Sequence, residues 1–153
     1  TNISFSKNKN IDYKTNFNGE VTDWGDTDIS FSPNLISSVG LNYSPKKDLN
    51  ISILNKFVGD QYMSNTESVV SKLNSYSTTD LNFIYSFKKS KHFNEVIFTA
   101  MLNNIFNKEY VSNGYYYTYD DTWSDPNMVT TIEGTGYYPQ AKRNFLIGFT
   151  FKL

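Results

Sequence analysis

Apolar and polar residues alternate along much of this chain, and the alternation is clearest in the last ten residues. From Asn144 to Leu153 every second position is large and apolar, and most positions between them are small or polar. The apolar positions are Phe145, Ile147, Phe149, Phe151 and Leu153. A period of two residues is typical of a β-strand whose two faces meet different surroundings. We therefore predict a final strand over residues 144–153.

The same alternation recurs upstream and predicts an all-β chain. Leu81, Phe83 and Tyr85, for example, alternate with Asn82, Ile84 and Ser86. Helical periodicity is nearly absent. Six strands are predicted, at residues 1–14, 34–45, 49–61, 79–88, 94–105 and 144–153.

The predicted connections alternate in length. Two are short, at residues 44–48 and 88–94, and three are long, at 15–33, 62–78 and 106–143. Outer-membrane barrels combine short periplasmic turns with long extracellular loops, and their strands cross the bilayer in about 9–11 residues. We therefore predict an antiparallel up-and-down transmembrane β-barrel segment. The apolar side chains on one face of its strands, here called the apolar lanes, would point toward lipid. A soluble β-sandwich also alternates, and it remains the alternative fold.

Six strands are too few to close such a barrel. Single-chain barrels begin at about eight strands, and an open sheet in lipid would leave backbone groups unpaired at its edges. We expect the chain to be one part of a longer barrel, or one of several chains that complete it.

Composition narrows the function classes. Aromatic residues make up 17% of the chain, against 19% charged residues, which suits strands with one apolar and one wet face. The net charge of −1 gives no support for nucleic-acid binding. The absence of cysteine excludes disulfides and thiolate metal sites. No apolar run approaches the roughly 18 residues of a membrane helix, and no signal peptide opens the sequence.

Three segments, in this order and spacing, resemble the end of TonB-dependent outer-membrane receptors of the Bacteroidetes type. Residues 29–34 read ISFSPN and continue through GLNYSP at 40–45. Residues 56–66 read KFVGDQYMSNT, similar to a family stretch YVGxQYxDNT from which Phe57 and Ser64 depart. Residues 102–110 read LNNIFNKEY, similar to NNLFNKxY, and YPQAKRNF follows at 138–145. The resemblance covers nearly the whole chain, 1–153, as the C-terminal portion of the barrel.

The resemblance implies a barrel of about 22 strands around an N-terminal plug, of which these would be the last six. It implies active import of a scarce nutrient such as a ferric siderophore, in the outer membrane of a Gram-negative bacterium. Its partners would be the plug and remaining strands, outer-membrane lipid, and TonB through the N-terminal part. An importer of oligosaccharide or peptide that works with a surface lipoprotein is the alternative in the same architecture. A soluble β-sandwich binding module is the alternative from another class.

The final strand also resembles the signal that the barrel-assembly machinery reads. That signal usually ends in Phe, so Leu153 is a departure from it.

Residues 106–143 hold the richest set of candidate ligand contacts. Clustered aromatics can stack on sugars or aromatic chelators, and carboxylates can bind Ca²⁺ through oxygen. The aromatic candidates are Tyr115, Tyr116, Tyr117, Tyr119 and Trp123, and the carboxylate candidates are Asp120, Asp121 and Asp125. Flexible points are expected at Gly114, Gly134 and Gly136. The alternative is that these aromatics only pack the loop against its neighbours over the barrel mouth.

Structural roles are predicted for several residues of the family-like motifs. Asn103, Asn104 and Asn107 stand where a strand meets a loop, and Asn favours turns through its own side-chain hydrogen bonds. Tyr110 suits an aromatic girdle at the membrane interface.

Catalysis has no support in the sequence, and no cofactor is expected beyond the Ca²⁺ considered above. The single histidine, His92, lies in a predicted short turn, and no G-x-S-x-G, phosphate loop or HExxH is present. The acidic stretch of Asp23, Asp26 and Asp28 is interpreted as a solvated loop. We predict that the protein is not an enzyme.

Overall fold

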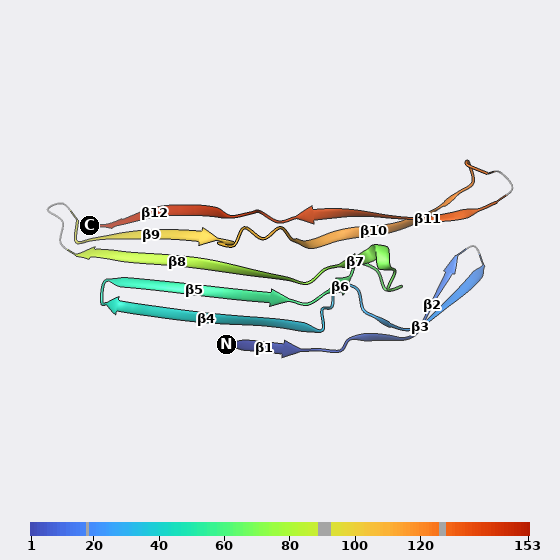
Figure 1. The fold of residues 1–153 in the computed structure, drawn as a ribbon, viewed down its shortest axis with the longest axis horizontal. Helices are drawn as coiled ribbons and strands as arrows, with labels where there is room; N and C mark the ends of the chain where they lie inside the picture. The colour runs from blue at the N-terminus through green and yellow to red at the C-terminus, as the bar shows by residue number, and fades with distance from the viewer. Residues whose placement is uncertain (18, 89–92, 126–127) are drawn as a thin grey trace.

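The computed structural model describes residues 1–17, 19–88, 93–125 and 128–153, and it is all-β with antiparallel strand pairing (Figure 1). The strands are β1 (Asn2–Phe5), β2 (Lys9–Phe17), β3 (Glu20–Asp28), β4 (Leu35–Lys46), β5 (Leu49–Val58), β6 (Gln61–Tyr62), β7 (Lys72–Leu73), β8 (Tyr76–Lys88), β9 (Glu95–Asn103), β10 (Val111–Asp121), β11 (Thr130–Pro139) and β12 (Asn144–Lys152). One 3₁₀ turn, η1 (Val69–Ser71), precedes β7. No helix within the described ranges is long and apolar enough to cross a membrane.

Six strands form the main sheet, in the order β1-β4-β5-β8-β9-β12. Five of the six predicted strands are confirmed, with ends that differ by up to three residues. The first predicted strand, 1–14, is wrong as a single element. The chain leaves the main sheet after Phe5, and β2 pairs with β3 in a separate two-stranded sheet.

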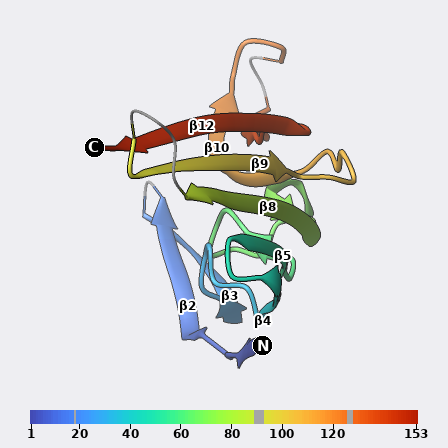
Figure 2. The same cartoon turned by 90° about the vertical axis from the view of Figure 1, so that its left-hand side faces the viewer.

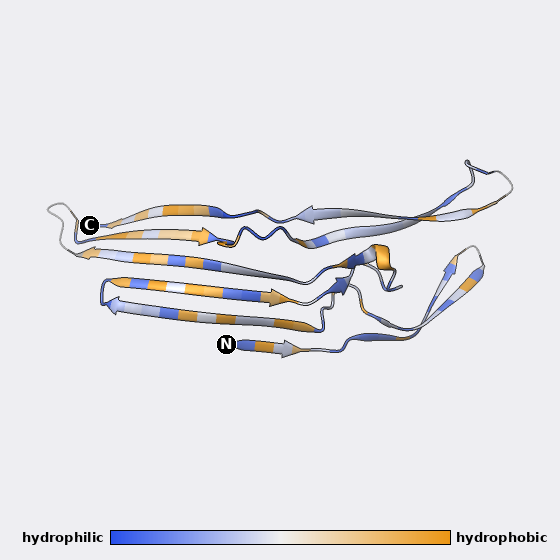
Figure 3. Ribbon diagram, in the orientation of Figure 1, coloured by the Kyte–Doolittle hydropathy of each residue, from blue (hydrophilic) through white to orange (hydrophobic). Residues whose placement is uncertain are grey.

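The register places the apolar lanes of neighbouring strands on one face of this sheet. Phe149 lies opposite Phe98, and Phe98 lies opposite Tyr85 on the next strand. The lane continues across the sheet as Ile51 lies opposite both Phe83 and Tyr43. Figure 3 shows the resulting alternation of hydrophobic and hydrophilic positions along the strands. One face of the sheet therefore carries the large apolar side chains that the sequence assigned to it.

The main sheet is a single open layer. β1 pairs only with β4 and β12 only with β9, so a closed barrel is not formed by the described residues. Figure 2, turned by 90°, shows β12, β9, β8, β5 and β4 following one another, and β2, β3 and β10 belong to separate two-stranded sheets. Large apolar side chains such as Phe145 (73% exposed) and Leu41 (66%) face open space, and the buried apolar residues among those described are Val58, Met63 and Leu73. The core expected of a β-sandwich is therefore not present in the described part of the chain.

The three long connections are not the loops that the sequence predicted. Two contain β-hairpins, β2–β3 and β10–β11, and the third contains the short β6–β7 pair and η1. All three extend from the same end of the sheet, opposite the tight turn between β4 and β5 (Figure 1). The prediction failed because β10 and β11 are dominated by Tyr, Thr and Gly and contain one aliphatic residue each, Val111 and Ile132, whereas aliphatic residues mark the strands elsewhere in the chain.

Candidate functional site

Four tyrosines form a continuous strip on one face of the β10–β11 hairpin. Tyr115, Tyr117 and Tyr119 alternate along β10, with successive ring centroids 6.2 and 6.4 Å apart and ring planes inclined by 26° and 18°. Tyr138 of β11 extends the row, with its ring centroid 6.1 Å from that of Tyr115. Each of the four side chains remains about half exposed, between 49% and 55%. We call these four residues the tyrosine strip.

Two glycines on β11 lie beneath two of the rings of the tyrosine strip. Gly136 lies opposite Tyr115 and Gly134 opposite Tyr117, and each ring lies across its glycine. A Cβ atom at either glycine would overlap the facing ring. These glycines belong to paired strands and are not the flexible points that the sequence predicted. Aromatic rings commonly cover strand glycines in this way, because glycine leaves room for a ring beside the backbone.

Tyr116 lies on the opposite face of the hairpin and is separate from the strip. Its hydroxyl donates a 2.5 Å hydrogen bond to the Glu133 carboxylate. This bond, followed by one from Ser68, holds the pKa of Glu133 below its ordinary value. Partial burial raises the pKa of the Tyr116 hydroxyl, and its bond to Glu133 raises it further. Because Ser68 caps η1, the pair connects this face of the hairpin to that turn.

The remaining aromatic candidate, Trp123, lies beyond the end of β10 and is 92% exposed. Its backbone N–H donates to the Asp121 carboxylate over 2.9 Å, and the Ser124 hydroxyl donates to the same group over 2.6 Å. These bonds hold the pKa of Asp121 below its ordinary value, with the Ser124 hydroxyl as the main cause. Asp121 therefore organises the turn that presents Trp123.

The three carboxylates proposed for Ca²⁺ are not brought together. Asp120 and Asp121 are adjacent in β10, so their side chains point to opposite faces of the hairpin. Asp120 accepts a hydrogen bond from the Thr131 hydroxyl over 2.8 Å, whereas Asp125 lies beyond the turn near Trp123. Among the described residues, no group of three or more acidic or histidine side chains is placed to hold a metal ion.

A groove of about 470 Å³ lies at the base of the hairpin. It is lined by Lys72, Lys108 and Lys142 together with Glu109, Tyr110 and Tyr137. Two of its lysines have carboxylate partners: Lys72 lies 2.5 Å from Asp60, and Lys142 pairs with Glu109. These hydrogen bonds raise the pKa of Lys72 and lower that of Glu109. The positive charge of the groove is therefore largely compensated within the chain.

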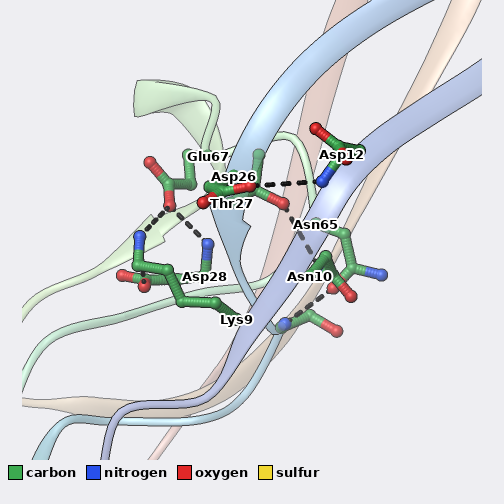
Figure 4. A network of polar contacts seen from close by, with 9 residues as sticks. Lys9, Asn10, Asp12, Asp26, Thr27, Asp28, Asn65 and Glu67 are labelled. Carbon is green, nitrogen blue, oxygen red and sulfur yellow. Dashed lines mark hydrogen bonds and ion pairs between the residues drawn. The ribbon is translucent and has the colours of Figure 1, made fainter.

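A polar network connects the base of the β2–β3 hairpin to the segment after β6 (Figure 4). The Lys9 ammonium lies 3.1 Å from the Asp28 carboxylate and 3.7 Å from that of Glu67. The backbone N–H of Asp28 donates to Glu67, and that of Ser30 donates to the Asn65 side-chain oxygen over 2.7 Å. These contacts thus join the first two long connections, the one that contains β3 and the one that contains β6 and β7.

The acidic stretch predicted to be a solvated loop belongs to β3. Asp23 lies 2.9 Å from the Lys14 ammonium, whose hydrogen bond lowers the pKa of Asp23. Asp26 accepts from the backbone N–H of Asp12 over 3.2 Å. These carboxylates pair with β2 and form no cluster with one another.

Asn104 has the structural role that the sequence predicted for it. It is 4% exposed and adopts a left-handed backbone conformation, with φ of 51°. Its side-chain amide donates to the carbonyls of Lys108 and Ala141, and its side-chain oxygen accepts from the Lys108 N–H. Asn107 accepts from the Arg143 N–H over 3.1 Å. Together these bonds tie the end of β9 to the start of β12.

The residues predicted as an assembly signal lie in or directly after β12, on the apolar face of the sheet. Phe145, Ile147, Phe149 and Phe151 are between 55% and 73% exposed, and Leu153 follows the strand at 89%. Their recognition by assembly machinery stays a prediction.

Sequence reasoning found three members of the tyrosine strip and missed Tyr138. The signal was present in the order of the residues, because Tyr115, Tyr117 and Tyr119 are two positions apart, whereas Tyr116 falls between them. Tyr138 could not be assigned, because its place beside Tyr115 depends on the register between β10 and β11. His92 lies outside the described residues.

No known protein-family model matches the chain, and a search of curated proteins gave no significant match.

Proposed function

We propose that this chain forms part of the wall of a TonB-dependent transporter in the outer membrane of a Gram-negative bacterium. The observation that carries the proposal is the register of the main sheet. It aligns the apolar lanes of neighbouring strands into one exposed face, as a lipid-facing wall requires. A soluble protein would rarely leave so large an apolar surface uncovered.

The positions of the three long connections between the strands of the main sheet support the same proposal. The hairpins leave one end of the sheet and the tight β4–β5 turn lies at the other (Figure 1). Barrels of this class place their long segments outside the cell and their short turns in the periplasm. The hairpins β2–β3 and β10–β11 would then be extracellular. Further strands and the plug of the same receptor would complete the wall and occupy its lumen, and TonB would energise import.

Transport of a scarce nutrient requires no catalytic residue in this chain. The titratable groups that the structure brings together, such as Lys9 with Asp28 and Glu67, hold hairpins in place by ion pairing. We propose a role in binding and passage of a nutrient, such as a ferric siderophore, rather than in its chemical conversion.

A pair of arginine substitutions in adjacent positions tests the wall. Phe98 lies in the middle of the apolar lane, between Tyr85 and Phe149, whereas Thr99 points to the other face. An arginine at the middle of a lipid face costs about 2–4 kcal/mol. Phe98→Arg should therefore greatly reduce the amount of folded protein that is recovered in the outer-membrane fraction of the cells. Thr99→Arg should leave that fraction near the wild-type amount.

Fractionation followed by heat-modifiable gel migration would measure both variants in the full-length protein. A wild-type protein that stays in the soluble fraction would contradict the proposal and favour the binding-module alternative. Equal loss for both variants would show that the two faces do not differ as a lipid-facing wall requires.

A further inference from the structure

The tyrosine strip has the shape of a binding surface for an extended ligand. From Tyr115 to Tyr119 the backbone advances by about 13 Å, at the rise of a β-strand. Successive rings along this length are inclined to each other by no more than 26°. Two of these rings occupy the space beside a glycine where a Cβ atom would otherwise stand, and both remain about half exposed. Such a row offers several parallel ring contacts to one linear molecule.

The charge of this region decides which ligands fit. Between Lys108 and Lys142 the sequence contains no Lys, Arg or His. The same stretch contains five carboxylates: Glu109, Asp120, Asp121, Asp125 and Glu133. An anionic ligand, such as a catecholate or hydroxy-carboxylate complex of iron, would meet no cation there and would be repelled at short range.

The carboxylates of the hairpin strands are themselves occupied. Glu133 and Asp120 lie on the face opposite the strip, bonded to Tyr116 and Thr131. Asp121 accepts three hydrogen bonds from the Trp123–Ser124 turn. The face of the strip thus offers aromatic rings and phenolic hydroxyls and no cation. Glu133 and Asp120 keep their negative charge but lie on the opposite face, so a cationic peptide on the strip would contact neither of them.

We propose that the tyrosine strip binds a neutral, linear oligosaccharide. The C–H faces of sugar rings can pack on the tyrosine rings, while sugar hydroxyls bond to the phenolic oxygens and to water at the exposed ring edges. The inference rests on the proposed function for the position of the hairpin outside the cell. It replaces an anionic ferric complex with a neutral glycan as the molecule that contacts this hairpin.

Binding to the full-length protein in detergent tests the ligand class. The probes are neutral glucose hexasaccharides with α-1,4, β-1,4 or β-1,3 linkages, a ferric catecholate complex and a hexalysine peptide, each followed by calorimetry. At least one neutral hexasaccharide should bind, and neither charged probe should bind in a way that depends on the strip.

Tyr119→Ala is the principal variant, because Tyr119 lies opposite Ile132 and its removal uncovers no glycine. It should weaken hexasaccharide binding about tenfold, equivalent to the loss of one good ring contact. Tyr137→Ala is the matched control, since Tyr137 is similarly exposed (49%) but lies on the other face. Its affinity should stay within about twofold of the wild-type value. Tyr117→Phe, which keeps the ring over Gly134, should retain most of the affinity and show that the hairpin is intact.

The outcomes separate this inference from the wall proposal. A ferric catecholate or hexalysine that binds more weakly to Tyr119→Ala than to wild type would overturn the glycan assignment. Absence of hexasaccharide binding would also overturn it, as would equal effects of Tyr119→Ala and Tyr137→Ala. Each of these results would leave the Phe98→Arg and Thr99→Arg comparison unaffected.

Discussion

The main sheet and the β10–β11 hairpin both expose rows of aromatic side chains, but the two surfaces differ in chemistry. The apolar face of β12 presents Phe145, Phe149 and Phe151, with Ile147 between them. The hairpin presents tyrosines that are about half exposed, and its strands contain no Phe or Leu. A face of hydrocarbon suits lipid, whereas a face of phenols suits a hydrated ligand.

The glycines of the two regions also differ. Around Gly148 in β12 an added Cβ would meet nothing within 4 Å, whereas at Gly136 it would overlap the ring of Tyr115. Gly148 in the main sheet therefore has free space beside it. Gly136 in the hairpin is required, because a larger residue would displace the ring of Tyr115. What an exposed row of aromatic side chains can bind therefore depends on the residues beneath and beside it.

Within the comparison of these two regions, the largest expected effect comes from valine at Gly136, with valine at Gly148 as the control. Gly136→Val should displace Tyr115 and cost about 1–3 kcal/mol, as overpacking commonly does, in a two-stranded hairpin with little stability of its own. Hydrogen exchange should then show most of the amide protection lost between residues 113 and 119. Gly148→Val should leave exchange in β12 unchanged, because its Cβ has free space. Equal protection in both variants would mean that the ring contact is not what orders the hairpin.

A smaller effect is expected where the sheet meets the hairpin. Asn104→Ala removes three side-chain hydrogen bonds at a buried position and places alanine in a left-handed conformation. The loss should be about 1–2 kcal/mol, seen as a lower midpoint of denaturation. Asn103→Ala is the control, because the Asn103 amide makes an exposed bond to Asn144. If both variants have the same midpoint, the junction does not depend on Asn104.

The smallest effect is a pH dependence confined to the hairpin. The Tyr116 and Ser68 bonds hold the pKa of Glu133 below its ordinary value of 4.5. A lowered pKa in the folded state means that this stabilisation is present above pH 4.5 and is lost as the pH falls through the folded-state pKa. Exchange of hairpin amides, corrected for intrinsic rates, should therefore speed up in that acidic range while exchange in the main sheet stays constant.

Tyr116→Phe provides the control for this prediction, because it removes the main hydrogen bond to Glu133. The acid-dependent part of the exchange should become smaller in this variant. An unchanged acid response would assign the effect to another carboxylate of the hairpin, such as Asp121, whose pKa is also lowered.

Sequence pattern was sufficient for strands whose alternation used aliphatic residues and phenylalanine. In β8 and β12, Phe83 and Phe149 are predicted to lie on the apolar face, and the register through Ala100 of β9 confirms that they share it. The pattern was not sufficient for β10 and β11, where Tyr, Thr and Gly alternate without a clear apolar side. It also could not show that residues 1–14 divide between two sheets, because pairing with β4 or with β3 depends on distant partners.

The order of residues was enough to predict the all-β character and the face that the side chains of the main sheet take. These follow from backbone geometry, since successive side chains of a strand point to opposite faces. Strand pairing was needed to establish which strands are neighbours, that β10 and β11 pair at all, that glycines underlie the tyrosine rings, and that Tyr138 joins them. Those contacts join residues far apart in the chain, and they exist only once the strands have paired in register.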